Sequence, residues 1–186
     1  MAELHKTRKS IRIKGYDYSK PGHYFITICT ENRSCLFGNV HNRQMVLNDM
    51  GGMIGKVWNE LPEHYPYVAL DAFVIMPNHV HGIIVLRPDP IVGAGLKPAR
   101  TKPARTKPAR TIKRHALPEI VRGLKTFSSR RINEIRNTPG VKLWQRNYYE
   151  HIIRNENELY KIRKYIQENP LKWETDKENP KHINIL

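Results

Sequence analysis

The chain has 186 residues, and its 32 Lys and Arg against 17 Asp and Glu give a formal net charge of +15 and a pI near 10.0. This length accommodates one ordinary domain with a hydrophobic core and excludes two large ones. The sequence lacks both the roughly 20 consecutive apolar residues of a membrane span and the apolar stretch of a secretory signal. We therefore expect a cytoplasmic protein with no membrane association.

The net charge points to a polyanionic partner. Nucleic acid is the first candidate, although a ribosomal protein, a protein that binds anionic membranes or a merely soluble basic domain would be charged in the same way. Cys29 and Cys35 are too few for a disulfide framework and lack the CxxC spacing of a zinc site, so both are expected to be plain thiols.

The first part of the chain predicts a strand and a helix. The segment Tyr24–Thr30 (YFITICT) is rich in aromatic and β-branched residues, which predicts a strand followed by a turn region at Gly38 and Asn39. Apolar residues recur at helical spacing from Leu47 to Leu61, which predicts a helix that Pro62 ends.

Two further strands are predicted next. From Val68 to Met76, every second residue, beginning with Val68 and Leu70, is apolar and is expected to share one face. After the short turn Pro77-Asn78, residues 79–86 are predicted to form a third strand antiparallel to the second.

A basic repeat interrupts the pattern. From Lys97 to Thr111 the sequence KPART occurs three times, and such a proline-rich tract has nothing apolar to bury. We predict a disordered loop at about 93–113 within one domain that spans 1–186. A neutral expansion of a surface loop is favoured over an arm that binds nucleic-acid phosphates. Without the six charges of the repeats, +15 becomes +9, so the remainder of the chain is basic as well.

Beyond the repeat, the spacing of apolar residues predicts a second amphipathic helix that ends near Pro139-Gly140. Its apolar positions are Ile120, Val121, Leu124, Phe127 and Ile135. Residues 148–153 predict a fourth strand, and Asn155 with Glu158 forms a capping signature for a last helix that stops at Pro170. The order β-α-β-β-α-β plus a C-terminal α predicts an α+β, ferredoxin-like fold, an antiparallel sheet with helices on one face.

The third predicted strand carries His79 and His81, two residues apart. A strand has a period of two, so both imidazoles face the same side and could reach one metal ion. Two surface or hydrogen-bonded histidines are the more common explanation of such a pair. The apolar setting strengthens the metal hypothesis, because buried polar rings need a ligand or a hydrogen bond. We expect Gly82 to leave space beside the pair.

The last predicted helix places Tyr165 and Asn169 on one face, with Tyr160 on the opposite flank. The amide oxygen of Asn169 could complete a His-His-Asn metal site. A phenol needs such help to act as a nucleophile, because it is protonated near neutral pH. An ordinary Tyr packed on the sheet, next to a helix-terminal Asn, is the alternative.

Four segments, in this order, resemble the single-tyrosine HUH transposases, in particular the REP-associated tyrosine transposases related to IS200-type insertion sequences. They are RIKGYDYSKPGHYFITICTENRSCLFG, VIMPNHVHGIIVL, LWQRNYYEHIIRNENEL and YIQENP. The resemblance covers nearly the whole chain except the KPART repeat. It implies a ferredoxin-like enzyme that cuts and rejoins single-stranded DNA near a hairpin. A tyrosine attacks the scissile phosphate, forming a 5′-phosphotyrosine and a free 3′-hydroxyl.

The same resemblance implies roles for individual residues. His79 and His81 match the metal ligands, Tyr165 matches the nucleophile, and Asn169 takes the place of the third ligand, where insertion-sequence relatives carry Gln. Tyr148 and Tyr149 are the rival nucleophiles. The implied metal is Mg²⁺ or Mn²⁺, although two imidazoles alone would also suit Zn²⁺ or Ni²⁺.

Contacts to DNA and the state of assembly are less determined. Basic residues of the second helix are expected to contact phosphates, and two aromatic residues to stack on bases: Arg122, Lys125, Arg130, Arg131, Trp144 and Tyr148. Monomer and homodimer both remain open. Two other functions also remain open, a non-catalytic hairpin-binding protein and a metal-dependent hydrolase. For the hydrolase the sequence shows no evident cluster of carboxylate ligands.

Overall fold

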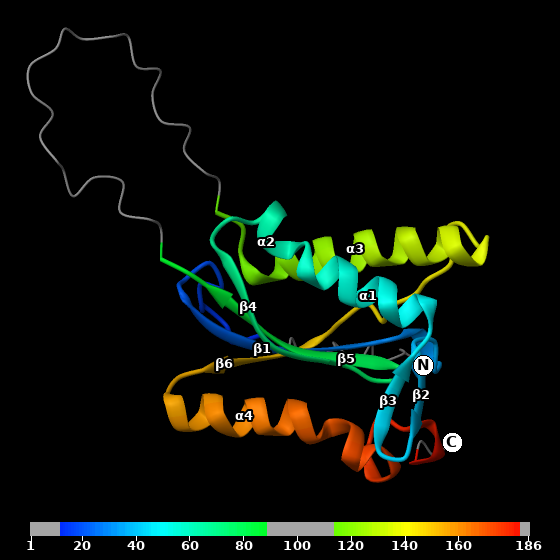
Figure 1. The fold of residues 1–186 in the computed structure, drawn as a ribbon. Coiled ribbons are helices and arrows are strands. Elements are labelled where there is room, and N and C mark those ends of the chain that lie inside the picture. Colours follow the sequence, from blue (N-terminus) through cyan, green and yellow to red (C-terminus); the bar gives the residue numbers. More distant parts are fainter. Residues whose placement is uncertain (1–11, 89–113, 183–186) are drawn as a thin grey trace, which may run out of the picture.

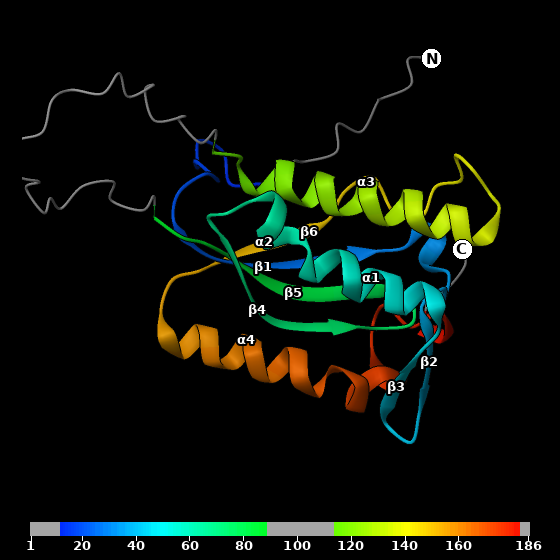
Figure 2. The same cartoon turned by 45° about the horizontal axis from the view of Figure 1, so that its top comes forward.

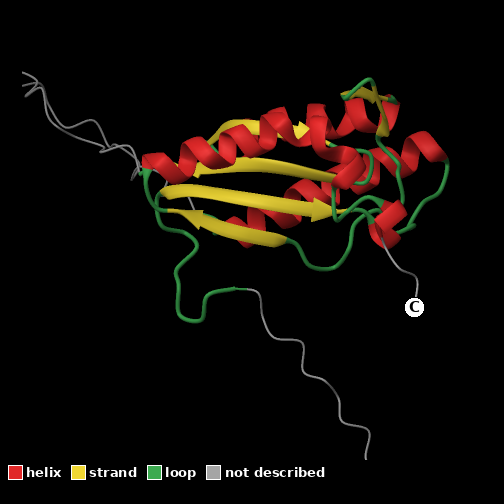
Figure 3. Cartoon of the chain, turned by 90° about the horizontal axis from the view of Figure 1, so that it is seen from below, coloured by secondary structure: helices red, strands yellow, loops and turns green. Residues whose placement is uncertain are grey.

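The computed structural model describes residues 12–88 and 114–182, and the KPART repeat lies outside these ranges. Its main sheet contains β1 (Gly22–Cys29), β4 (Val68–Ile75), β5 (His79–Leu86) and β6 (Tyr149–Ile153). All neighbouring strands are antiparallel, in the order β4-β5-β1-β6, and they run side by side in Figure 3. The predicted ferredoxin-like order is confirmed, and β5 is hydrogen-bonded along both edges.

Helices cover both faces of this sheet (Figures 1 and 2). One face carries α1 (Asp49–Asn59), α2 (Leu61–His64) and α3 (Leu117–Arg136), as the ferredoxin-like pattern requires. The C-terminal helix α4 (Glu156–Glu168) packs against the opposite face, and the 3-10 segments η2 (Asn169–Thr175) and η3 (Pro180–His182) follow it. Within the described ranges, no helix combines the length and the apolar character needed to cross a membrane.

The two faces bury two separate apolar clusters. The larger cluster, with Ile26, Ile84 and Leu124, lies between the sheet and α1 and α3. The smaller cluster, with Ile83 and Ile166, lies under α4. Because residues alternate along β5, its odd-numbered residues point toward α4, which determines where the two histidines of this strand lie.

A hairpin that the sequence did not indicate stands apart from the main sheet (Figure 1). It consists of β2 (Gly38–His41) and β3 (Gln44–Leu47), where only a turn region was predicted. The two residues between the strands, Asn42 and Arg43, have φ of 49° and 63°. Positive φ at both central residues is typical of a type I′ hairpin turn, which Asn-Gly or Asp-Gly usually forms. The dipeptide Asn-Arg is not typical of this turn, so the sequence did not predict the hairpin.

The first helix is shorter than predicted. It begins after the N-cap Asn48, whose side chain accepts from the backbone N–H of Gly51, and it ends at Asn59. Pro62 does not end this helix but lies in the first turn of α2. A backbone N–H at this position makes no hydrogen bond within the helix, so proline loses none there.

The alternation predicted for the second strand is wrong beyond Leu70. The register of β4 against β5 shifts between Leu70 and Phe73, so Phe73 joins Val68 on the α1 and α3 face. Ala72 and Val74 turn to the α4 face instead. An irregularity of one residue moves every following side chain of the strand to the opposite face of the sheet. The polar Asp71 at this point does not indicate such an irregularity in the sequence.

Helix α3 buries a narrower stripe than predicted. Leu124 and Ile132 are buried, but Phe127 and Ile135 are more than 40% exposed, so their assignment to the core is wrong. Phe127 instead stacks on the ring of His64 at the surface, with 5.3 Å between ring centroids. The helix ends at Arg136, and its C-cap Asn137, two residues before Pro139, has a left-handed conformation.

Gly82 does not make room beside the histidines, because it points to the opposite face. A Cβ built there would lie 2.5 Å from Cη2 of Trp58, whose ring stacks on Phe73. We predict that Gly82→Ala lowers the free energy of unfolding by about 1–3 kcal/mol, measured by urea denaturation, because the buried indole must shift. Gly52→Ala is the control, since nothing lies within 4 Å of that position in α1. An equal loss of stability in both variants would contradict this account.

Candidate active site

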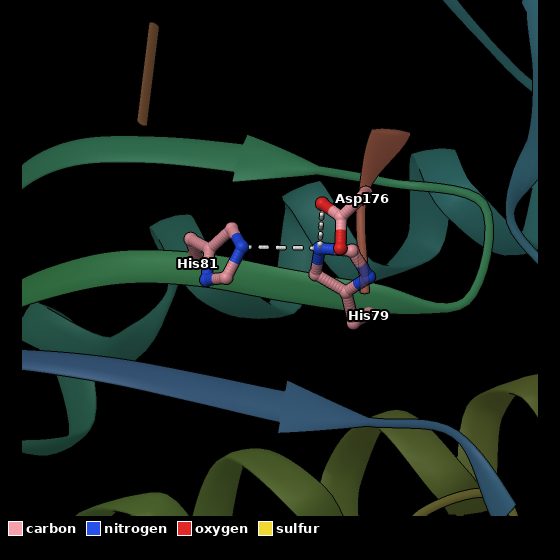
Figure 4. A group of neighbouring side chains, drawn as sticks. All are labelled: His79, His81 and Asp176. Carbon is pink, nitrogen blue, oxygen red and sulfur yellow. Dashed lines mark hydrogen bonds and ion pairs between the residues drawn. The ribbon is translucent and has the colours of Figure 1, made fainter. Parts of the chain in front are cut away.

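His79 and His81 lie side by side on β5 (Figure 4), and Tyr165 of α4 contacts His81. Their side chains are almost completely buried, with 0% and 2% of their surface exposed, and their Nε2 atoms are 3.0 Å apart. Each Nδ1 has another partner: Oδ1 of Asn78 lies 2.8 Å from that of His79, and Oγ1 of Thr27 lies 2.8 Å from that of His81. The two Nε2 atoms therefore remain to face a common point.

Burial lowers the pKa of both imidazoles. For His81, the neighbouring His79 lowers the pKa further, whereas the carboxylates of Asp176 and Glu178 oppose the effect of burial on His79. Both rings are therefore neutral near pH 7, and the neutral imidazole is the form that binds a metal ion.

Tyr165 reaches the same point from α4. Its hydroxyl lies 3.2 Å from Nε2 of His81, and its ring packs edge-on against His81 and Phe25. Burial raises the pKa of the phenol, and Asp176 raises it further, whereas Asn169 lowers it. The phenol therefore stays protonated near neutral pH unless positive charge is placed beside it.

Asn169 follows α4 directly and is 2% exposed. Its side chain is close enough to His79 and Tyr165 to influence the pKa of both. Its Oδ1 is buried, and no hydrogen-bond donor for it is found among the described residues. Such an orphaned acceptor costs about 1–3 kcal/mol, so a cation bound at this place would relieve it.

The structure adds Asp176, a carboxylate that the sequence did not indicate. Its Oδ2 lies 3.9 Å from Nε2 of His79, and with the two histidines it forms a cluster whose ligand atoms lie within 4.8 Å of one another (Figure 4). The sequence showed no evident cluster of carboxylate ligands, and the structure places this one carboxylate beside the histidines. Asp176 follows η2, where neither strand nor helix periodicity applies, so no sequence signal could have placed it.

These donors fit a small divalent cation. Two imidazole nitrogens, a carboxylate and an orphaned amide oxygen form a mixed nitrogen and oxygen set of the kind that binds such ions. The structure thus brings His79, His81, Tyr165 and Asn169 together within one chain. It also adds a fifth residue, Asp176.

The rival tyrosines lie at the edge of the same site. A cavity of about 470 Å³ is lined by His81, Tyr165, Tyr148 and Tyr149, among others. Tyr149 is half exposed and packs against Phe25. Of these three tyrosines, only Tyr165 has a hydroxyl hydrogen bond to a histidine in the described ranges.

Two cations lie near the ring of Tyr148. The guanidinium of Arg12 and the ammonium of Lys125 lie 5.7 and 5.5 Å from its centroid, and burial raises the pKa of its phenol. Lys125 in turn donates to the backbone carbonyls of residues 145, 146 and 147. Its ammonium therefore braces this loop, rather than extending toward a phosphate as predicted.

Other predicted DNA contacts are also engaged within the protein. Arg131 forms an ion pair with Glu60 at 2.7 Å, whereas Arg130 and Arg122 are largely exposed and pair within α3, with Glu134 at 3.2 Å and Glu119 at 3.9 Å.

Trp144 is 7% exposed. Its Nε1–H donates to Oγ of Ser128, and its ring packs on Phe37, with 5.2 Å between centroids. Because only 7% of the residue is exposed, the indole mainly packs in the core, and its predicted stacking on a base stays a prediction.

Comparisons with known proteins identify relatives of this chain. The family described as "Transposase IS200 like" matches residues 110–169. An uncharacterized protein of Haemophilus influenzae is 43% identical over 172 residues, which cover 91% of each chain. A second protein of that organism, named as a candidate REP-associated tyrosine transposase, is 26% identical over 156 residues, covering 84% of this chain and 74% of the relative.

A solved structure is similar in fold. It is a REP-associated tyrosine transposase bound to a REP hairpin, and it matches with a TM-score of 0.56 at 19% identity. The match covers 87% of this chain and 73% of that one.

Proposed function

The chain belongs to the IS200-like transposase family that includes the REP-associated tyrosine transposases, and from this premise we propose that it cuts and rejoins single-stranded DNA through Tyr165. The observation that carries the proposal is the approach of the Tyr165 hydroxyl to the paired histidines, 3.2 Å from Nε2 of His81. All these residues lie in one chain, so one copy could supply the nucleophile and the proposed ligands together.

We assign the cation to Nε2 of His79 and His81, with oxygen from Asp176 and Asn169. Carboxylate and amide oxygens favour Mg²⁺ or Mn²⁺ over metals that prefer softer ligands. When bound, the ion would polarise an oxygen of the scissile phosphate and offset its developing negative charge.

The protein side chains supply the nucleophile and its orientation. Phe25 and His81 hold the phenol ring of Tyr165 by edge-on packing, so its oxygen stays beside the ligand atoms. The phenol oxygen bonds to phosphorus, the bond from phosphorus to the 3′-oxygen breaks, and a 5′-phosphotyrosine and a 3′-hydroxyl result. The proton lost by the phenol balances the one gained by the 3′-oxygen, so the reaction needs no net proton and no ATP.

A denaturing gel tests this function. The protein is incubated with Mn²⁺ and single-stranded DNA that contains a hairpin and is labelled at its 3′ end, because the fragment on that side of the cut is the one that stays attached to the tyrosine. A labelled band at the size of protein plus DNA is the expected result, and EDTA should prevent it. The absence of this band with folded, DNA-bound protein would contradict the proposal.

We further propose where the DNA strand lies. A groove of about 920 Å³ runs between the second half of α3 and residues 139–146, and Arg130, Lys142 and Arg146 line it. A second cavity shares Lys142 and Arg146 with this groove, and Gln145 and Asn147 connect it to the cavity of Tyr165. A single strand that leaves a hairpin could follow these basic residues to the nucleophile, in keeping with the hairpin bound by the structural relative.

This path predicts a salt-dependent loss of affinity. The double variant Lys142→Gln with Arg146→Gln should bind the single-stranded part of the substrate more weakly. The slope of log affinity against log salt should become shallower by about 0.7 for each charge removed. Fluorescence anisotropy at several salt concentrations measures both quantities.

Arg122→Gln is the matched control, because it removes an exposed charge from α3 outside the groove. If Arg122→Gln lowers affinity as much per charge as the double variant, the strand follows the exposed face of α3 instead.

A further inference from the structure

Asn78 lies in the turn between β4 and β5, immediately before His79, and none of its surface is exposed. Its side-chain Nδ2 donates to two backbone carbonyls, that of Arg33 at 2.9 Å and that of Glu178 at 2.7 Å. Its Oδ1 lies 2.8 Å from Nδ1 of His79. The backbone carbonyl of Asn78 also accepts bonds from the N–H and the hydroxyl of Thr30. The amide nitrogen, the amide oxygen and the backbone carbonyl of Asn78 thus all have partners.

These contacts determine which end of the Asn78 amide is nitrogen. A carbonyl oxygen can only accept, so the end that faces the carbonyls of Arg33 and Glu178 must be the NH₂ group. The opposite end is then an oxygen, which can only accept as well. Nδ1 of His79 must therefore carry a proton and donate it to Asn78.

The proton on Nδ1 decides the state of the other nitrogen. A neutral imidazole carries one proton, so Nε2 of His79 keeps a free lone pair. That lone pair is directed at His81 and Asp176. The partner of His81 is different, because the hydroxyl of Thr27 can rotate to donate or to accept and so suits either tautomer. Only His79 is held in the metal-binding tautomer by a group that cannot adapt.

The same amide holds the acidic segment of the site. Glu178, whose carbonyl Asn78 binds, is two residues beyond Asp176, and the backbone N–H of Glu178 donates to Oδ1 of Asp176 at 2.7 Å. The other carboxylate oxygen of Asp176 is the one nearest His79. The carboxylate of Glu178 pairs with Arg33 at 2.6 Å, which secures the segment a second time.

We propose that Asn78 is the positioning residue of this metal site, which presupposes the metal-dependent function proposed above. It holds His79 in the Nδ1–H tautomer, and through the carbonyl of Glu178 it keeps Asp176 within reach of the same ion. Outer-shell partners of metal-binding histidines commonly change metal affinity by about 10–100-fold when they are lost.

Two measurements test the proposal. Histidine side-chain NMR of the metal-free protein reports the tautomer of His79, and the Mn²⁺ signal in electron paramagnetic resonance reports metal affinity. Asn78→Ala should lose the preference for Nδ1–H and bind Mn²⁺ about 10–100-fold more weakly. Asn78→Asp keeps an acceptor for His79, so the Nδ1–H tautomer should persist in that variant.

Asn133→Ala is the matched control, because Asn133 is a buried amide that donates to the carbonyl of Val141, away from the histidines. It should leave both readouts unchanged. An unchanged His79 tautomer in Asn78→Ala, or wild-type Mn²⁺ affinity in that variant, would overturn the proposal. Failure of the wild-type protein to bind Mn²⁺ would instead refute the proposed metal site, and the metal-free NMR comparison would still test the tautomer.

Discussion

Tyr165→Phe is expected to abolish the covalent protein–DNA adduct, lowering its rate of formation by at least about 1000-fold, while hairpin DNA still binds. The substitution removes only the oxygen that lies 3.2 Å from Nε2 of His81. The ring contacts with Phe25 and His81 can persist, so the site should keep its shape. Adduct formation is read on a denaturing gel, and DNA binding is measured separately by anisotropy.

Two other tyrosines provide controls for this result. Tyr160→Phe alters an exposed residue of the same helix, and Tyr149→Phe alters the rival at the edge of the cavity. Both variants should form the adduct at close to the wild-type rate. An adduct that persists in Tyr165→Phe but disappears in Tyr149→Phe would show that the nucleophile is assigned wrongly.

The two alternative functions would give different results on the same denaturing gel. A hairpin-binding protein without activity would bind DNA and form no adduct with any of these tyrosines. A metal-dependent hydrolase would cut the DNA in the presence of Mn²⁺ and leave no DNA attached to Tyr165.

Replacing both His79 and His81 by Ala is expected to remove measurable Mn²⁺ binding and, with it, the adduct. The loss should exceed the roughly 10–100-fold that an outer-shell partner contributes, because two of the proposed ligands are removed directly. Mn²⁺ titration followed by electron paramagnetic resonance measures the affinity without depending on activity. Wild-type affinity in this double variant would place the metal elsewhere.

Single substitutions then decide which oxygen donors belong to the site. Asn169→Ala removes the orphaned Oδ1, and Asp176→Asn removes the charge nearest His79 while it keeps the size of the side chain. If both take part, each variant should bind Mn²⁺ more weakly than wild type. A loss in Asn169→Ala alone would support the ligand set expected from sequence resemblance. A loss in Asp176→Asn alone would make the carboxylate the third ligand.

Parts of the site could be predicted from the sequence because they depend on neighbouring residues. The period of two in β5 places His79 and His81 on one side, and the observed strand has the predicted bounds. The capping signature of Asn155 is confirmed, since its side chain accepts from the backbone N–H of Glu158 and starts α4 there. Helical spacing likewise relates Tyr165 to Asn169. In each case the information lies within a few residues, where backbone geometry is regular.

Other features depended on packing between distant segments. Trp144 is an aromatic residue of the kind that stacks on bases, but its indole is buried. Its Nε1–H donates to Ser128, and its ring packs on Phe37. The sequence alone does not show why residue 82 is a glycine. The structure does, because Trp58 packs so closely against Gly82 in the core that a Cβ would clash with its indole.

By itself, therefore, the sequence determined the order of the four main-sheet strands and the three long helices, the shared face of the two histidines and the spacing of Tyr165 and Asn169. Only the tertiary structure decided that α4 lies on the histidine side of the sheet, where its Tyr165 contacts His81, because either face of a strand can be covered. The tertiary structure also placed Asp176 beside His79. The chain after Pro170 has no helical or strand periodicity that predicts its course, and contacts such as the hydrogen bond from Asn78 to the carbonyl of Glu178 hold it in position.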